Sequence, residues 1–118
     1  MKVLSSLVCG VLLGACSQIT EPKDVQLAAA NTTKQFKIWG NCNMCKETIE
    51  SSLQVEGIAK ANWNKDSKQM LVEFDSSKIS LPQIYHHIAM VGYDTEAERG
   101  NDSAYAELPD CCQYDRKP

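Results

Sequence analysis

The sequence lacks the patterns that mark nucleic-acid binding and the common kinds of catalysis. Over 118 residues the formal net charge is −3, and the lysines and arginines are scattered rather than clustered, so we expect no nucleic-acid partner. There is no Ser-His-Asp set, phosphate-binding loop or nucleotide-binding fingerprint, and no pair of carboxylates suited to acid–base catalysis. We therefore expect a binding domain that is not an enzyme and has no small organic substrate.

The sequence also lacks an apolar run long enough to span a bilayer as a helix. The shorter apolar run Val3–Leu13 follows Lys2, which is typical of a signal peptide, and we place that peptide at residues 1–15. Residues 13–16 (Leu-Gly-Ala-Cys) resemble the bacterial lipobox, in which the cysteine, here Cys16, is lipidated. This motif predicts a lipoprotein of the bacterial cell envelope, anchored to a membrane through a lipid. The alternative is an ordinary secretory signal peptide and a secreted periplasmic protein.

The residues after Cys16 predict where the anchor lies and where the folded domain begins. Ser17, rather than Asp, follows Cys16, which favours the outer membrane, facing the periplasm, over the inner membrane. Residues 16–33 have little periodicity and are predicted to be a flexible tether. The folded domain is expected at residues 34–99, followed by a C-terminal extension at residues 100–118.

Hydrophobic periodicity within the expected domain predicts four strands and two helices. The strands are expected at residues 34–39, 58–64, 70–75 and 93–99, and the helices at residues 45–54 and 81–91. Ser80, followed by Pro82 and Gln83, is a typical start for the second helix. The order β-α-β-β-α-β predicts an α+β, ferredoxin-like fold, with a four-stranded antiparallel sheet and two helices on one face.

Cys42 and Cys45 lie where the first strand is expected to turn into the first helix. At this spacing both sulfurs can point to one place, and the free backbone N–H groups of a helix start, together with Lys46, favour thiolates over thiols. Two thiolates are a soft donor pair that suits Cu(I), Zn(II) and other thiophilic ions. We interpret Met44, between them, as a loop anchor on the core rather than as a thioether ligand.

Three short motifs within residues 34–98 resemble the heavy-metal-associated domain family: Cys42-x-x-Cys45, Val55–Ile58 and Val91–Asp94. That family includes copper chaperones, the N-terminal modules of copper-transporting P-type ATPases, and periplasmic mercury-binding proteins. The resemblance implies that Cys42 and Cys45 are the metal ligands. It also implies that Gly92 and Tyr93 lie in the loop beside the metal.

The resemblance further implies the cargo and the partners. Cu(I) is the first expectation for the bound ion, with Hg(II), Zn(II) and Cd(II) behind it. The expected partner is a metal-donor or metal-acceptor protein, such as a copper-transporting ATPase or an efflux component, and the expected role is metal capture, transfer or detoxification. The chain departs from the family at Gly40, where the family often has Met, and at Asn41, where it often has Thr.

Two other uses of Cys42 and Cys45 remain open: a structural disulfide, and thiol–disulfide exchange. No proline lies between the two cysteines, none follows at a plausible cis position near the site, and the predicted order lacks a thioredoxin-like core. Metal binding is therefore the preferred function, and thiol–disulfide exchange is the alternative.

Cys111 and Cys112, in the C-terminal extension, are candidate third and fourth ligands beside Cys42 and Cys45. An extended chain points adjacent side chains to opposite sides, so coordination by both requires a turn. At about 3.3 Å per residue the extension is long enough to fold back across a small domain. The two cysteines could instead bind a second ion, form a disulfide over the site, or pair between molecules.

The two histidines are not expected to take part. His86 and His87 are neighbours on the second predicted helix, about 100° apart, so they do not face one ion together.

Overall fold

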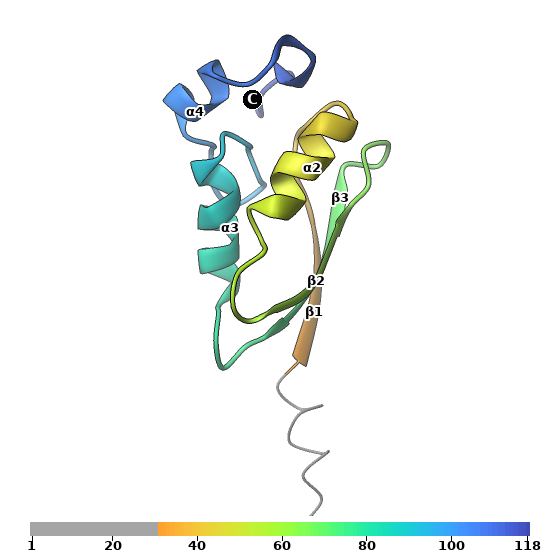
Figure 1. Cartoon of the computed structure of the whole chain (residues 1–118), viewed down its shortest axis with the longest axis vertical. Coiled ribbons are helices and arrows are strands. Elements are labelled where there is room, and N and C mark those ends of the chain that lie inside the picture. Colours follow the sequence, from red (N-terminus) through yellow and green to blue (C-terminus); the bar gives the residue numbers. More distant parts are fainter. Residues whose placement is uncertain (1–30) are drawn as a thin grey trace, which may run out of the picture.

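The computed structural model describes residues 31–118 (Figure 1). The expected signal peptide, Cys16 and most of the expected tether lie outside the described residues. Within residues 31–118 no helix is both long and apolar enough to cross a membrane. In chain order the elements are β1 (Asn31–Lys37), α2 (Asn43–Ser51), β2 (Ile58–Trp63), β3 (Gln69–Asp75), α3 (Leu81–Met90), α4 (Asp102–Ala106) and the 3-10 turn η1 (Asp110–Cys112).

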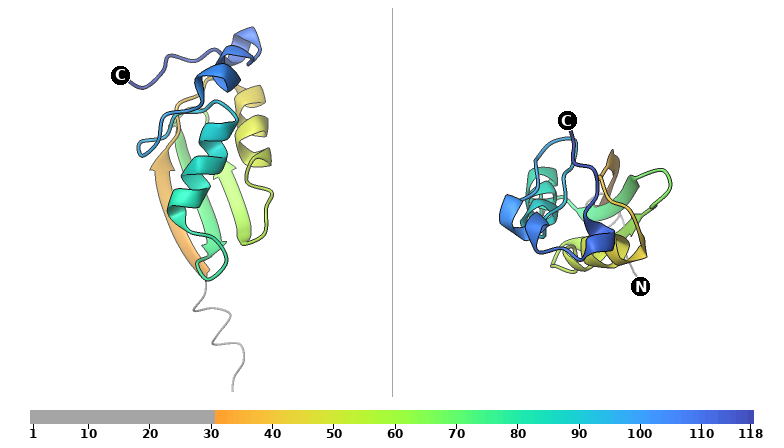
Figure 2. Two further views of the ribbon diagram at one scale, coloured as in Figure 1. Left: turned by 90° about the vertical axis from the view of Figure 1, so that its left-hand side faces the viewer. Right: turned by 90° about the horizontal axis from the view of Figure 1, so that it is seen from above.

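The strands form a three-stranded antiparallel sheet in the order β1-β3-β2. In the central strand, β3, Met70, Val72 and Phe74 are buried and the residues between them are half-buried, as expected for a strand with one face on the core. Both α2 and α3 lie on that face of the sheet (Figure 2). The predicted α+β, ferredoxin-like fold is thus confirmed in its layers and in the order of its first five elements.

The fourth strand, expected at residues 93–99, does not form within the described part of the chain, where a single bridge joins Ile38 to Thr95. The main-chain groups of this segment have other partners. The Asp94 N–H donates to the hydroxyl of Tyr114 at 2.9 Å, and the Glu98 N–H donates to the hydroxyl of Thr95 at 3.0 Å. Because hydroxyl groups take these two donors, the segment forms no ladder with β1 beyond the single bridge within the described residues, and the predicted four-stranded sheet was wrong.

The helices follow the predicted pattern more closely. The Ser80 hydroxyl accepts from the Gln83 N–H at 3.3 Å, and the Gln83 side chain accepts from the Ser80 N–H at 2.8 Å, so the predicted start of α3 is a complete capping box. Helix α2 ends at Ser51, before the predicted end at Gln54, because the N–H of Leu53 turns to the carbonyl of Glu50 at 3.1 Å. Strand β1 begins at Asn31, ahead of the predicted start at residue 34, because its ladder with β3 runs on to the last residue of that strand.

The C-terminal extension packs on the end of the domain where α2 begins and α3 ends (Figure 1). Asn101 caps α4 by accepting from the Ala104 N–H at 2.9 Å, and the Asn101 N–H donates to the Ala89 carbonyl at 2.8 Å. The α4 backbone passes so close to Gly92 that a Cβ there would lie 2.8 Å from the Tyr105 nitrogen. Gly92 also has a φ of +96°, so only glycine suits this position without strain.

Two buried residues hold the last part of the chain. The Tyr114 hydroxyl donates to the Gly92 carbonyl at 2.7 Å, and the Tyr114 ring stacks on the ring of Tyr93 at 5.4 Å. The buried carboxylate of Asp94 accepts from the Arg116 guanidinium at 2.7 Å. Burial acts to raise the pKa of Asp94, but the hydrogen bonds from Arg116 and from the N–H groups of Lys117 and Gly100 outweigh it and lower the pKa to about 2. The extension is therefore an integral part of the fold.

Replacing Tyr114 with Phe should destabilise the protein by about 1–3 kcal/mol, because the buried Gly92 carbonyl and Asp94 N–H would both lose their partner. Urea denaturation followed by tryptophan fluorescence measures this. The matched control is Tyr85→Phe, which keeps the edge contact of that ring with Phe36 and should change stability by less than about 0.5 kcal/mol. Equal effects of the two substitutions would contradict the assignment.

Candidate metal centre

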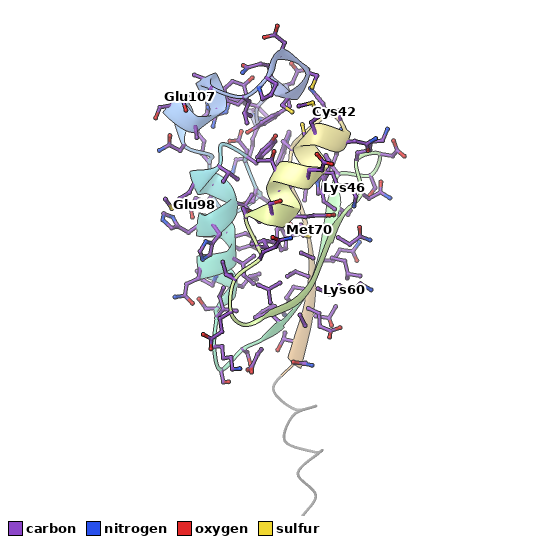
Figure 3. All side chains as sticks on the ribbon, in the orientation of Figure 1. Cys42, Lys46, Lys60, Met70, Glu98 and Glu107 are labelled. Carbon is purple, nitrogen blue, oxygen red and sulfur yellow. The ribbon has the colours of Figure 1, made fainter. Side chains whose placement is uncertain are left out.

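Four cysteine sulfurs come together between the start of α2 and the turn η1. Figure 3 shows the labelled Cys42 at the end of α2 that faces the C-terminal extension. The Cys42 Sγ lies 3.7 Å from the Cys45 Sγ, 3.5 Å from the Cys111 Sγ and 3.8 Å from the Cys112 Sγ. The structure thus brings together all the cysteines within residues 31–118 that the sequence proposed as ligands.

The loop that carries Cys42 is packed on Trp63. The buried indole of Trp63 donates to the Ile38 carbonyl at 3.1 Å, and its ring lies 2.9 Å from the place where a Cβ on Gly40 would be. A larger side chain at Gly40 would collide with that ring. Met44 is 48% exposed, so the expectation that it anchors the loop on the core was wrong.

The turn that the adjacent cysteines require is η1. The Cys112 N–H donates to the Pro109 carbonyl at 2.8 Å, and the Gln113 N–H donates to the Asp110 carbonyl at 3.1 Å. This 3-10 turn brings the Cys111 and Cys112 sulfurs to 3.9 Å from each other. The Gln113 side chain holds the turn on the preceding segment by donating to the Leu108 carbonyl at 2.8 Å.

The four sulfurs differ in depth. Cys45 and Cys112 are 0% and 1% exposed, Cys42 is half-buried, and Cys111 is exposed. Cys42, Cys45 and Cys112 form a set, here called the inner set, whose sulfurs all lie within 4.8 Å of one another. Among the residues that the structure describes, no histidine or carboxylate joins a set of this kind.

The histidines lie elsewhere, as predicted. His86 is exposed on α3 and its Nδ1 lies 3.1 Å from the Glu98 Oε2, while His87 is half-buried on the same helix.

The local environment favours ionisation of the Cys42 thiol. The hydrogen bond from the Cys45 N–H is the main cause that lowers the pKa of Cys42 to about 7; burial opposes it, and the Cys111 thiol and the Met44 N–H add to it. Burial raises the pKa of Cys112, and the hydrogen bond to Cys42 raises the pKa of Cys111. The start of α2 therefore supplies the first thiolate.

Lys46 was expected from the sequence to favour the Cys42 thiolate, but it is not among the groups that lower the pKa of Cys42. Its ammonium forms an ion pair with Glu50 and also donates to the Asn62 side chain at 2.7 Å and to the Trp63 carbonyl at 2.9 Å. The charge of Lys46 thus serves the contact between α2 and β2.

Tyr93 places a hydroxyl beside the inner set. Within residues 31–118 this buried hydroxyl has no hydrogen-bond partner, and the nearby polar groups that affect its pKa are the thiols of Cys45 and Cys112. Burial raises the pKa of Tyr93, and the two sulfurs raise it further, so the hydroxyl keeps its proton. A hydroxyl beside these sulfurs can stabilise them when they are ionised, as metal-bound thiolates are.

Comparison with known proteins places these features among metal-handling proteins. The copper chaperone CopZ of Staphylococcus aureus is 34% identical to this chain over 55 residues, which are 46% of this chain and 81% of CopZ. A solved structure of a CopZ metallochaperone is 30% identical with a TM-score of 0.53, and the match covers 54% of this chain and 98% of that one. The N-terminal soluble domains of Bacillus subtilis CopA share the fold at 24% identity and a TM-score of 0.51, over 65% of this chain and 56% of that one. No protein-family model matches the chain.

Alkylation of the reduced apoprotein should modify Cys42 first and Cys112 last. Because the thiolate is the reactive form, the rate at Cys42 should rise with pH and reach half its maximum near pH 7, since the pKa is about 7. The buried Cys112, whose pKa is raised, should stay unmodified over that range. Peptide mapping by mass spectrometry after brief exposure to iodoacetamide measures each site separately. A faster reaction at Cys112 than at Cys42 would refute this order.

Proposed function

Because the chain belongs to the heavy-metal-associated domain family, we propose that it binds Cu(I) through the thiolates of Cys42 and Cys45 and passes the ion to a partner protein. The named relatives support this proposal, since CopZ is a copper chaperone. The sulfur cluster supports it from this chain's own residues. Metal binding requires no bond to be made or broken in an organic substrate, so the protein acts as a carrier.

The observation that carries the proposal is the spacing of the sulfurs in the inner set. With metal–sulfur bonds of about 2.3 Å, a linear ion holds its two sulfurs about 4.6 Å apart, a trigonal ion about 4.0 Å and a tetrahedral ion about 3.8 Å. Cys42 lies 3.7 Å from Cys45 and 3.8 Å from Cys112. The set therefore suits an ion with three or four sulfur ligands better than a linear one.

This geometry ranks the candidate ions. Cu(I) accepts soft thiolate ligands, and the three sulfurs of the inner set can surround it. Zn(II) prefers a tetrahedral set of four ligands, which would require Cys111 as well. We rank Cd(II) below Cu(I) together with Zn(II). Hg(II) in its linear form would need the sulfurs to move apart. We therefore keep Cu(I) first and the other ions as outcomes of the same binding test.

Transfer to a partner requires access to at least one ligand. Cys45 and Cys112 are buried, whereas Cys42 is half-buried and Cys111 is exposed, so an incoming thiolate would approach from the side of Cys42. A copper-transporting ATPase or an efflux component is the partner that this exchange would suit. A lipid on Cys16 would hold the domain in the cell envelope, facing the periplasm, where such partners are accessible.

Thiol–disulfide exchange remains the second candidate, because Cys42 has the lowered pKa, about 7, that a nucleophilic thiol needs. An insulin-reduction assay separates the two functions. We expect no turnover above that of a free dithiol at the same concentration.

Replacing Cys42 and Cys45 together with Ser should abolish tight Cu(I) binding and leave the fold intact, because serine is close to cysteine in size. Competition with a colorimetric Cu(I) chelator measures the binding, and circular dichroism checks the fold. The matched variant is Cys111→Ser with Cys112→Ser, which keeps a two-thiolate site and should bind more weakly than the natural sequence. Tight stoichiometric binding by the Cys42 and Cys45 variant would rule out the proposal.

X-ray absorption on protein loaded with one Cu(I) should count three sulfurs per copper, and the Cys112→Ser variant should show two. This substitution tests the ligand alone, whereas truncation after Arg99 would also remove the packing of Tyr114 and the ion pair of Arg116. Two sulfurs in both proteins, with equal affinities, would mean that Cys112 is not a ligand.

A further inference from the structure

A second group of sulfurs lies on the outer side of the inner set. The Cys111 Sγ is 3.4 Å from the Met44 Sδ and 3.5 Å from the Cys42 Sγ. Cys111 is exposed and Met44 is 48% exposed, so this group faces solvent, while Cys45 and Cys112 lie beneath it. Cys42 belongs to both groups.

We propose that Met44, Cys111 and Cys42 form a second site, here called the outer site, for a soft monovalent ion of the kind Cu(I) exemplifies. The Cys42 thiolate would bridge the ion in the outer site and the ion in the inner set. The proposal rests on the proposed function, because it assigns the same cargo, and extends it from one ion to two.

The donor atoms define which ions the outer site accepts. A thioether together with thiolates is a ligand set for Cu(I), whereas Zn(II) takes thiolates, imidazoles and carboxylates but not thioethers. A thiolate sulfur has more than one lone pair, so Cys42 can bind two ions at once. The outer site thus discriminates between ions by the type of its donor atoms, whereas the inner set discriminates only by the number and spacing of its sulfurs.

The fold holds the outer sulfurs in place from both sides. Met44 lies in the first turn of α2, where its carbonyl accepts from the Thr48 hydroxyl at 3.0 Å. Cys111 lies within η1, which the Cys112 N–H closes by donating to the Pro109 carbonyl at 2.8 Å. The Met44 side chain is 48% exposed, and its sulfur contacts the Cys111 sulfur of η1 at 3.4 Å.

The two sites would differ in function because they differ in depth. An ion in the outer site has solvent-facing ligands and can exchange with a partner, while an ion in the inner set is enclosed by buried sulfurs. The shared sulfur gives a path between them: the ion keeps its bond to Cys42 while the other ligands change. Capture from outside would thus occur at Met44 and Cys111, and retention at Cys45 and Cys112.

The test is a Cu(I) titration followed by native mass spectrometry of the reduced full chain. All proteins carry Cys9→Ser and Cys16→Ser, so that no thiol outside the cluster contributes. We expect two Cu(I) per monomer in this background and one in Met44→Leu or in Cys111→Ser. The matched control is Met90→Leu, which makes the same change at a methionine that is 60% exposed on α3 and should keep two ions. Zn(II) should bind no more than one ion in any of these proteins.

Each result decides the proposal. Loss of one ion in Met44→Leu and Cys111→Ser, but not in Met90→Leu, supports the outer site. Only one ion in the background protein, or two ions in Met44→Leu, overturns it and leaves the proposed function standing. No bound Cu(I) in any protein overturns the proposed function as well. A bridging Cys42 also requires a copper–copper distance in the X-ray absorption spectrum of the two-ion form, and its absence would refute the bridge.

Discussion

The structure depends on how the buried carboxylate of Asp94 is satisfied. A buried charge without partners is costly, and here the partners are the Arg116 guanidinium and the N–H groups of Lys117 and Gly100. Two of these partners belong to the last residues of the chain, so the need to pair Asp94 holds the C-terminal extension on the domain. The same attachment sets the position of Cys111 and Cys112, which lie just before Tyr114. The sulfur cluster is therefore a consequence of an ion pair that contains no sulfur.

The sequence predicts the local features of this protein better than its long-range pairings. The capping box of α3 and the placement of Cys42 and Cys45 at a helix start follow from residues close together in the chain. A fourth strand is predicted at residues 93–99 from a segment with few apolar residues, and whether such a segment pairs depends on which groups accept from its N–H donors. Here the Tyr114 hydroxyl takes one of them from the far end of the extension, and no periodicity reports that. Met44 is exposed rather than packed on the core, and its sulfur contacts Cys111, which is 67 positions away in the chain.

The burial of the sulfurs also affects which of the cysteine thiols are ionised. Burial raises the pKa of Cys112, so this thiol keeps its proton at neutral pH, whereas the lowered pKa of Cys42, about 7, favours its thiolate. Binding of a soft cation would displace the proton of Cys112, and the Tyr93 hydroxyl beside it can then donate to the new thiolate. Under the proposed function, metal uptake would therefore release a proton from Cys112.

The separation of the cysteines along the chain has a consequence for the order of assembly. The contact between Cys42 and Cys111 spans 69 positions in the chain. Closing so long a loop costs more conformational entropy than forming a local contact, so we expect this contact to form late in folding. The surface on which Tyr114 packs, made by Gly92 and Tyr93, must exist before the extension can bind to it. Cys111 and Cys112 therefore join Cys42 and Cys45 only after the rest of the domain has formed. A partly folded chain would offer an ion only the pair of thiols at the start of α2, and the enclosed cluster would be available only in the fully folded protein.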